Sequence, residues 1–182
     1  LKHFGITTRQ QSYHKFNEHK KVTNIVDNLK AGKQIALVSD AGTPGISDPG
    51  YLVVKHCLDN EIEVQCLPGA TAFVPALVVS GLASERFCFE GFLPQKKGRS
   101  KKLNELANET RTMVFYESPY RLIKALTQMA EIFGTERQAS VSREISKIHE
   151  ESVKGSLQEL IEYYNTHTLK GEIVLVVSGK AG

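Results

Sequence analysis

The sequence predicts an α/β protein of two domains, with a parallel-sheet N-terminal domain and a mixed-sheet C-terminal domain. In the first half, apolar runs typical of strands alternate with segments of helical spacing, which indicates a parallel sheet with helical crossovers. In the second half, two strand-like segments joined by a tight turn indicate an antiparallel pair within a mixed sheet. We place the domains at residues 1–82 and 86–182.

The N-terminal domain is expected to contain two buried strands, each followed by a loop and a helix. A first helix has apolar spacing and ends at Gly32. The runs QIALVSD at 34–40 and EIEVQCL at 61–67 are typical of buried strands. Helices are expected to follow them, through 50–60 and within 68–82.

The C-terminal domain is expected to contain five strands with helices between them. SLQE at 156–159 is a capping box and indicates the start of a helix. A proline after Ser118 and a glycine at Gly134 bracket another helix. The predicted strands are 86–93, 112–118, 137–144, 147–155 and 171–179.

The composition is that of an ordinary soluble globular protein. Of 182 residues, 41% are hydrophobic and 24% charged, and the formal net charge of +3 does not by itself indicate a nucleic-acid partner. No apolar run approaches the roughly 18 residues of a membrane span, so we expect no membrane partner. Cys57, Cys66 and Cys88 lack CxxC spacing, and we interpret them as reduced thiols of a cytoplasmic protein without a metal site.

The segment SDAGTPGISDPG, residues 39–50, follows the first predicted strand and is typical of a ligand-binding loop. Ligands of open α/β sheets bind outside the carboxyl ends of the strands. The glycines allow close approach of the backbone, and the prolines reduce the entropy lost on binding. The loop is neither a P-loop nor a dinucleotide fingerprint. A structural turn with Asp48 as the cap of the next helix is the open alternative.

The segment LPGATA, residues 67–72, ends the second predicted strand in a similar way. Its small residues leave room for a flat ring, and the following helix N-terminus offers free N–H donors. Because the carboxyl ends of adjacent parallel strands share one edge, we expect the two loops to form one crevice.

Four motifs, SDAGTPGISDPG, LPGATA, FYESPYR and SREISKIHEE, closely resemble in order and spacing the ribosomal RNA methyltransferases of the tetrapyrrole-methylase-like (class III) family. The resemblance covers nearly the whole chain. It implies a two-domain tetrapyrrole-methylase-like fold, S-adenosylmethionine bound between the domains, and a homodimer. It also implies methyl transfer to the ribose 2′-hydroxyl of a cytidine in small-subunit ribosomal RNA, with that RNA or the small ribosomal subunit as partner.

The cofactor contacts follow in part from the loops and in part from the resemblance. Residues 39–41 match the first cofactor motif of the family, Thr71 and Ala72 its second contact, and Tyr116 the wall from the second domain. The predicted cofactor-binding residues are Ser39, Asp40, Ala41, Gly42, Thr43, Gly45, Thr71, Ala72 and Tyr116.

The chain departs from the family pattern at both ends. The family opens with a strand and a Pro-x-Gly-Asn loop of the methyl-transfer site, whereas this sequence begins at LKHFGI. The family also continues beyond GEIVLVVSG. We therefore expect a piece of a longer protein whose sheet lacks a central strand and whose activity alone is impaired.

Methyl transfer to a ribose hydroxyl needs a general base but no metal. The candidate bases are Glu117, Glu144 and His149, and the sequence does not choose among them. Glu117 equally fits a helix cap beside Ser118, and His149 equally fits a solvent-facing strand position.

RNA binding is predicted at a basic loop, whose cations would contact phosphates and make binding salt-dependent. The predicted RNA contacts are Lys96, Lys97, Arg99, Lys101, Lys102, Arg121 and Arg143. A solvated surface loop is the alternative for the first five, and structural ion pairs for the two remaining arginines.

Two other functions compete with an RNA ribose methyltransferase. A methyltransferase of a tetrapyrrole or another small molecule would keep the cofactor, but would not need the five clustered cations of 96–102. A non-catalytic RNA-binding module would need no small-residue crevice such as the one expected at 39–50.

Overall fold

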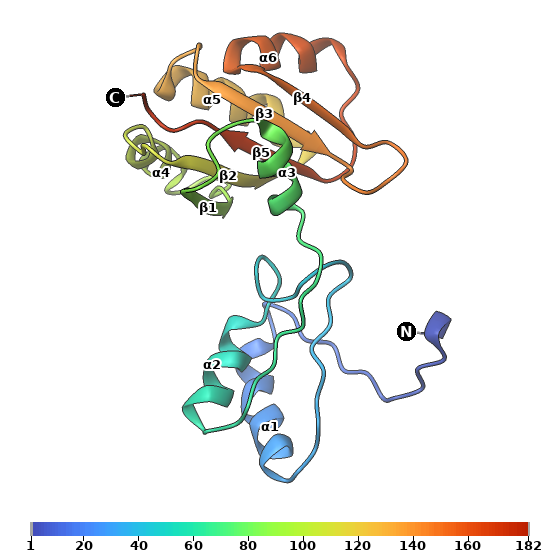
Figure 1. Cartoon of the computed structure of the whole chain (residues 1–182). Coiled ribbons are helices and arrows are strands. Elements are labelled where there is room, and N and C mark those ends of the chain that lie inside the picture. The colour runs from blue at the N-terminus through green and yellow to red at the C-terminus, as the bar shows by residue number, and fades with distance from the viewer. Residues whose placement is uncertain (1, 182) are drawn as a thin grey trace. The chain divides into compact units, whose positions relative to one another are not determined.

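A five-stranded sheet with β5 (Ile173–Val177) at its centre organises the larger part of the molecule. The computed structural model describes residues 2–181. Its contacts divide the chain into two units, Leu1–Ala70 and Thr71–Gly182, which are described separately (Figure 1). All five residues of β5 are buried, because helices cover both faces of the sheet.

The sheet of the second unit is mixed, as the sequence predicts. Its order is β1-β2-β5-β3-β4, with β1 parallel to β2 and every other pair antiparallel. The remaining strands are β1 (Phe87–Phe92), β2 (Thr112–Glu117), β3 (Gln138–Arg143) and β4 (Glu151–Ser156). The predicted antiparallel pairing of the third and fourth strands is confirmed, although β4 begins only after a turn over 144–150.

Three helices cover one face of this sheet: α4 (Arg99–Leu106), α5 (Leu122–Phe133) and α6 (Leu157–Thr166). In Figure 1, α5 and α6 lie side by side over the strands. Leu126 of α5 and Leu175 of β5 belong to the shared core and are fully buried. The alternate side chains of the strands that point to this face therefore pack against the apolar sides of the helices.

The opposite face is covered by α3 (Phe73–Ser80), whose Ala76 and Leu77 pack against Val114, Val174 and Val176. The predicted boundary after residue 82 therefore differs from the observed division after Ala70. The physical reason is that this short, strongly apolar helix buries its side chains against the sheet of the second unit.

The ends of α6 and α5 follow local sequence signals. The Glu159 N–H donates to Ser156 Oγ at 3.2 Å, and the Ser156 N–H donates to Glu159 Oε2 at 2.7 Å, which confirms the capping box. A short 3₁₀ turn, η2 (Pro119–Arg121), precedes α5. Gly134 ends α5 with a φ of 96°, in the region that favours glycine.

The first unit contains two packed helices, α1 (Glu18–Lys30) and α2 (Tyr51–Asp59), preceded by the short turn η1 (Lys2–Phe4). Their core consists of Val22, Val26, Val53 and Cys57. None of the helices described in either unit is long and apolar enough to reach across a bilayer.

The parallel sheet predicted for the N-terminal domain is not confirmed. No strand is present among the described residues of the first unit, and the segments 34–40 and 61–67 run without a ladder of backbone hydrogen bonds. Apolar alternation favours extended backbone, but a strand also needs a hydrogen-bonding neighbour. Without one, apolar side chains of these segments stay in solvent, and Val38 is 62% and Leu67 79% exposed.

Candidate functional site

The two small-residue loops of the first unit contact each other directly. The backbone N–H of Thr43 donates to the carbonyl oxygen of Ala70 at 2.9 Å, and Thr43 Oγ1 donates to the same oxygen at 3.2 Å. The loop at 39–50 is thereby attached to the segment 67–70. The expected proximity of the two loops is present even though the sheet expected to cause it is not.

Glycine is required where these loops approach each other. A Cβ atom on Gly42, whose φ is 73°, would lie 2.8 Å from the carbonyl oxygen of Ala70. A Cβ atom on Gly69 would lie 3.1 Å from Thr43 Oγ1. A side chain at either position would push the loops apart or strain the backbone.

Asp40 offers an exposed carboxylate at the start of this loop. It makes no hydrogen bond or ion pair with any described residue, so both oxygens can accept from a ligand. Ser39 Oγ, by contrast, donates to the carbonyls of Ala41 and Gly42 at 3.0 and 2.8 Å and closes the turn. Ser39 thus shapes the loop, and Asp40 is the group that can bind.

Asp48 does not cap α2. The helix begins at Tyr51 with Gly50 as N-cap, and no side chain caps it. The alternative in which Asp48 is an ordinary helix cap is therefore wrong. Asp48 lies instead on the exposed part of the loop.

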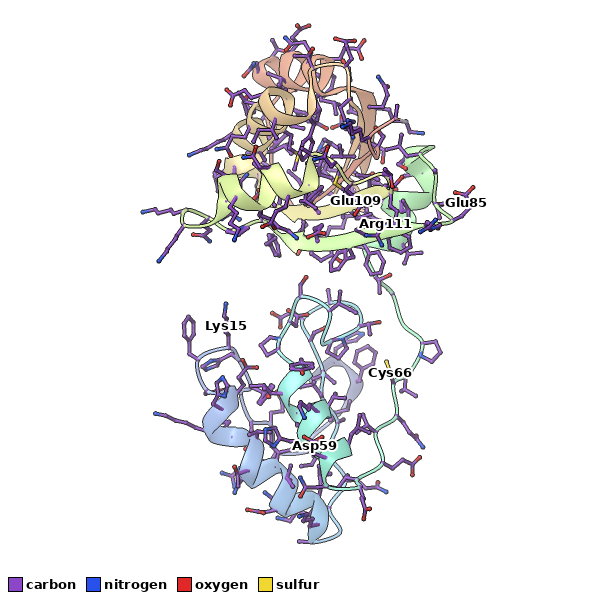
Figure 2. The ribbon with its side chains drawn as sticks, turned by 90° about the vertical axis from the view of Figure 1, so that its left-hand side faces the viewer. Lys15, Asp59, Cys66, Glu85, Glu109 and Arg111 are labelled. Carbon is purple, nitrogen blue, oxygen red and sulfur yellow. The ribbon has the colours of Figure 1, made fainter. Side chains whose placement is uncertain are left out.

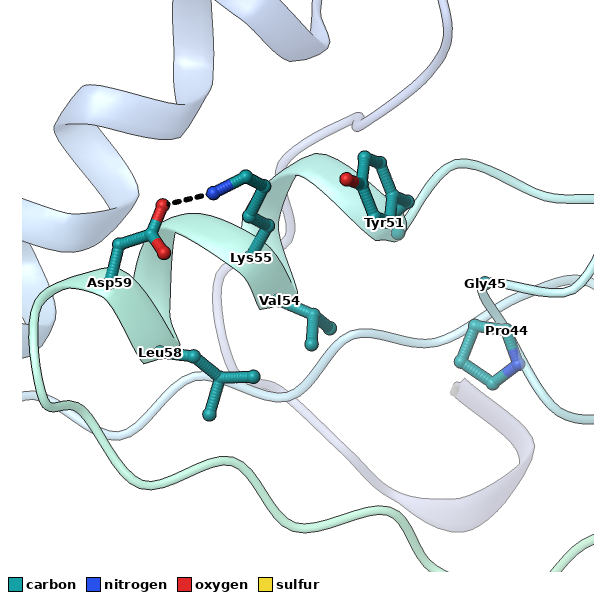
Figure 3. A pocket seen from close by; sticks show the side chains of 8 residues that line it. Pro44, Gly45, Tyr51, Val54, Lys55, Leu58 and Asp59 are labelled. Carbon is teal, nitrogen blue, oxygen red and sulfur yellow. Dashed lines mark hydrogen bonds and ion pairs between the residues drawn. The ribbon is translucent and has the colours of Figure 1, made fainter.

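An open pocket of about 520 Å³ lies between this loop and α2 (Figure 3). Of the predicted cofactor contacts Gly45 lines this pocket, whereas Asp40 and Thr43 do not. The side chains of Lys55 and Asp59 pair across its rim at 2.6 Å. The lining residues are Pro44, Gly45, Gly50, Tyr51, Val54, Lys55, Leu58 and Asp59.

The remaining predicted cofactor contacts belong to the second unit. Thr71 is half-buried and Ala72 is exposed, directly before α3. Tyr116, near the end of β2, packs edge-on against Phe89 with ring centroids 5.1 Å apart, and against Phe92 at 5.6 Å. These aromatic contacts hold the Tyr116 ring on the face of the sheet that α3 covers.

Glu117 is buried at the carboxyl end of β2 with both carboxylate oxygens engaged. Its Oε1 accepts from the Ser118 N–H at 2.8 Å and from Arg121 Nε at 2.9 Å. Its Oε2 lies 3.6 Å from Arg99 Nη2, within ion-pair distance but beyond a hydrogen bond. The buried carboxylate is thus held between a backbone N–H and two arginines, which fits an anchor for the turn after β2.

The other two candidate bases differ in their surroundings. Glu144 accepts from the Glu172 N–H at 2.9 Å and from Lys147 Nζ at 2.9 Å. The backbone bond, followed by the lysine, holds the pKa of Glu144 below its ordinary value, which disfavours proton uptake. His149 is exposed in the turn before β4 and makes no hydrogen bond or ion pair with any described residue.

Within the basic loop, Arg99 has a different environment from the lysines. Arg99 is only 6% exposed, and it donates through Nε to Gln128 Oε1 at 2.7 Å and through Nη1 to the Pro94 carbonyl at 3.3 Å. Its guanidinium faces the interior, so its predicted contact with RNA is wrong. Sequence reasoning missed Gln128, because a glutamine on an amphipathic helix gives no signal of such a role.

The four lysines of the predicted basic loop are at the surface to different degrees, and only Lys96 and Lys97 lie in a loop, because Lys101 and Lys102 belong to α4. Lys101 lies 3.9 Å from Glu105, and Lys102 pairs with Glu90 at 2.6 Å. Lys96 and Lys97 are exposed and form no ion pair with a described residue. These two lysines are therefore the most accessible cations of the segment.

Arg143 pairs with Glu151 across β3 and β4, with Nε 2.8 Å from Oε2. Tyr163 OH also donates to this carboxylate, at 3.2 Å to Oε1. The arginine hydrogen bond holds the pKa of Glu151 below its ordinary value against the opposing effect of burial. The observed contacts of Arg143 thus fit the alternative interpretation, in which it is a structural ion-pair partner.

The three cysteines are free thiols in different environments. Cys57 is buried, Cys88 is intermediate, and Cys66 is exposed on the extended segment after α2 (Figure 2). Figure 2 also shows Glu109 and Arg111, whose side chains pair at 2.8 Å in the second unit. Across residues 2–181, histidine, cysteine and carboxylate side chains form no group of three that could hold a metal ion.

The family model for Tetrapyrrole (Corrin/Porphyrin) Methylases matches residues 2–161 of this chain. The chain belongs to this family. The predicted tetrapyrrole-methylase-like class is thereby confirmed. The tetrapyrrole methylase fold is also seen in the methyltransferase CobJ, whose structure matches 98% of this chain and 80% of its own with a TM-score of 0.66 at 18% identity.

Curated relatives within the tetrapyrrole methylase family are much closer in sequence. The protein named Ribosomal RNA small subunit methyltransferase I from Synechocystis is 50% identical over 98% of this chain and 64% of its own. The protein of the same name from Haemophilus influenzae is 45% identical over 99% of this chain and 65% of its own. The chain thus spans slightly less than two thirds of the length of these relatives.

A uroporphyrin-III C-methyl transferase from Thermus thermophilus, solved with S-adenosyl homocysteine, also shares the fold. It matches 88% of this chain and 73% of its own with a TM-score of 0.59 at 16% identity. At this identity the likeness concerns the fold alone.

The Arg143–Glu151 pair predicts a pH-dependent contribution to stability. Because the folded-state pKa of Glu151 lies below its unfolded value of about 4.3, the charged carboxylate stabilises the fold at neutral pH. This stabilisation is lost as the pH falls through the folded-state pKa. Glu151→Gln should therefore lower the free energy of urea unfolding at about pH 7, and its deficit relative to the unsubstituted protein should shrink below about pH 4.

The matched control is Glu105→Gln, which changes an exposed carboxylate on α4. It should leave the free energy of unfolding nearly unchanged across this pH range. A deficit of Glu151→Gln that stays constant with pH would contradict the assigned role of the charge.

Proposed function

We propose that this protein transfers a methyl group from S-adenosylmethionine to the ribose 2′-hydroxyl of a cytidine in small-subunit ribosomal RNA. The observation that carries the proposal is 45–50% identity, over nearly the whole chain, to curated proteins named Ribosomal RNA small subunit methyltransferase I. The likeness to corrin and porphyrin methyltransferases is between 14% and 18% identity and supports only the shared fold.

The residues of the first unit fit the proposed cofactor. When bound, S-adenosylmethionine would supply a sulfonium-activated methyl group. Asp40, exposed and without a protein partner, would accept hydrogen bonds from a ribose hydroxyl or from the ammonium group. The close contact of Gly42 with the Ala70 carbonyl brings two stretches of small residues together where a flat ring could lie. The remaining proposed contacts are Ser39, Ala41, Thr43 and Gly45 of the first unit, and Thr71, Ala72 and Tyr116 of the second.

For the proton of the ribose hydroxyl, His149 is our preferred base. Its imidazole is exposed and is not held by another side chain of the described part. Glu117 is fixed in place by the Ser118 N–H and by Arg121. Glu144 is engaged by the Glu172 N–H and by Lys147, and its lowered pKa disfavours proton uptake.

The finer features of the resemblance belong to the same proposal. They are the two-domain arrangement with a parallel sheet in the N-terminal domain, the homodimer, and the cytoplasmic location. The RNA contacts retained in the proposal are Lys96, Lys97, Lys101, Lys102, Arg121 and Arg143. The two lysines without an acidic partner, Lys96 and Lys97, should contribute most.

Mapping ribose methylation tests the proposed function directly. Small-subunit ribosomal RNA from cells that lack the protein should lose the 2′-O-methyl group of one cytidine, and expression of the protein should restore it. An unchanged ribose methylation map would refute the RNA substrate. Accumulation of an unmethylated tetrapyrrole in the same cells would support a small-molecule methyltransferase instead.

Asp40→Ala should weaken the binding of S-adenosylmethionine about tenfold, or about 1.4 kcal/mol, because it removes the free carboxylate of the loop. Titration calorimetry measures this. The control is Asp48→Ala, which removes another exposed carboxylate of the same loop and should leave affinity unchanged. Equal affinities for the two variants would remove Asp40 from the cofactor site.

Charge reversal of the lysines at 96, 97, 101 and 102 should weaken RNA binding and flatten its dependence on salt. Each lost phosphate contact lowers the slope of log K against log salt by about 0.7 to 0.9. The double variant of Lys96 and Lys97 should account for most of the change. Reversal of Lys124 and Lys170, two exposed lysines outside the loop, is the control. If RNA affinity survives the fourfold reversal, the loop is only a solvated surface.

A further inference from the structure

Tyr120 is the most exposed aromatic residue of the second unit, with 96% of its surface accessible. It lies in η2, between Pro119 and Arg121, directly after β2 ends. An aromatic ring in this position contributes nothing to the core. Its large apolar face is available to a partner that can stack on it.

The neighbouring Arg121 is held along one edge only. Its Nε donates to Glu117 Oε1 at 2.9 Å, while its side chain remains about 30% exposed. No described residue accepts a hydrogen bond from its two terminal nitrogens. A guanidinium fixed in this way presents its remaining N–H groups as a fork that matches a phosphate group.

The basic loop is attached to the same carboxylate. Arg99 lies 3.6 Å from Glu117 Oε2 through Nη2 and donates to the Pro94 carbonyl through Nη1. Lys96 and Lys97 lie in the chain between Pro94 and Arg99. Positive charge therefore adjoins the Tyr120–Arg121 turn, which favours a polyanion over an ordinary protein surface as partner.

We propose that Tyr120 and Arg121 dock one unpaired nucleotide of the RNA, with its base stacked on the tyrosine ring and its phosphate bound to the guanidinium. Single-stranded RNA is commonly recognised by such a combination of aromatic ring and arginine. Glu117 is a positioning residue that holds Arg121 in place. This inference rests on the proposed action on RNA and assigns the point at which the strand is held.

The test measures binding of a short single-stranded oligoribonucleotide, and of its duplex, by fluorescence anisotropy. Tyr120→Ala should weaken binding of the single strand about tenfold, and Tyr120→Phe should retain it, because stacking needs the ring and not the hydroxyl. Arg121→Lys should also weaken binding, because an ammonium group lacks the fork. The duplex should respond less than the single strand to Tyr120→Ala. Tyr51→Ala, at an exposed tyrosine of the first unit, is the control.

The role of Glu117 is tested by a double-mutant cycle with Arg121. Glu117→Gln should weaken RNA binding when Arg121 is present and should have little further effect on top of Arg121→Gln. A merely structural role of Glu117 would instead give additive losses. Thermal unfolding of each variant identifies those that fail to fold, and the exposed Tyr120 variants keep the test valid in that case.

The outcomes separate this inference from the proposed function. If the unsubstituted protein binds no RNA, the RNA substrate itself is refuted. If it binds RNA and the Tyr120 and Arg121 variants bind equally well, the docking point is overturned. If Tyr120→Ala abolishes self-association while RNA affinity is intact, the turn is a protein contact and the inference is again overturned.

Discussion

A buried carboxylate needs cations and hydrogen-bond donors around it, and Glu117 at the end of β2 has both. Its two oxygens connect the turn after the strand, through Arg121, with the basic loop, through Arg99. Loss of one partner would leave the charge partly unpaired, which in buried pairs costs about 3–5 kcal/mol. The conformations of the loop and the turn thus depend on one another through this single residue.

The place of β2 within the sheet explains why the residues at its carboxyl end are held rigidly. The strand lies between β1 and β5, and both of its faces are covered by the two apolar clusters. Its position is therefore fixed by packing, and the residues at its carboxyl end inherit that rigidity. Tyr116 is held by aromatic contacts and Glu117 by its ion pairs. Two neighbouring residues of one strand are therefore fixed in two different environments.

Much of the second unit could be predicted because its signals are local. The alternation in β3 and β4 and the capping box at Ser156 each depend on residues close in sequence. The burial of Arg99 could not be predicted, because its environment is set by Glu117 and Gln128, which are far from it in the chain. In a run of five cations, nothing local distinguishes the one that faces the interior.

For a related reason, the sequence predicts the contact between the two loops of the candidate site but not the backbone structure that precedes them. The contact between Thr43 and Ala70 agrees with the expectation of one crevice, since small residues and turns bring the loops together. The strands expected before each loop are not confirmed, because apolar alternation is a property of one segment whereas a hydrogen-bonded ladder needs two. Which face of the sheet α3 covers is likewise set by tertiary packing, and the composition of the helix does not predict it.

The lack of a ladder in 34–40 and 61–67 has a thermodynamic consequence for any ligand of the first unit. Backbone without hydrogen-bonded neighbours retains more conformational entropy. A ligand that binds Asp40 must offset the part of this entropy that is lost on binding. The measured affinity of a ligand for this loop would then include the free-energy cost of ordering the two segments as well as the gain from the contacts. Occupancy and local order would rise together, as they do when a disordered segment folds on its target.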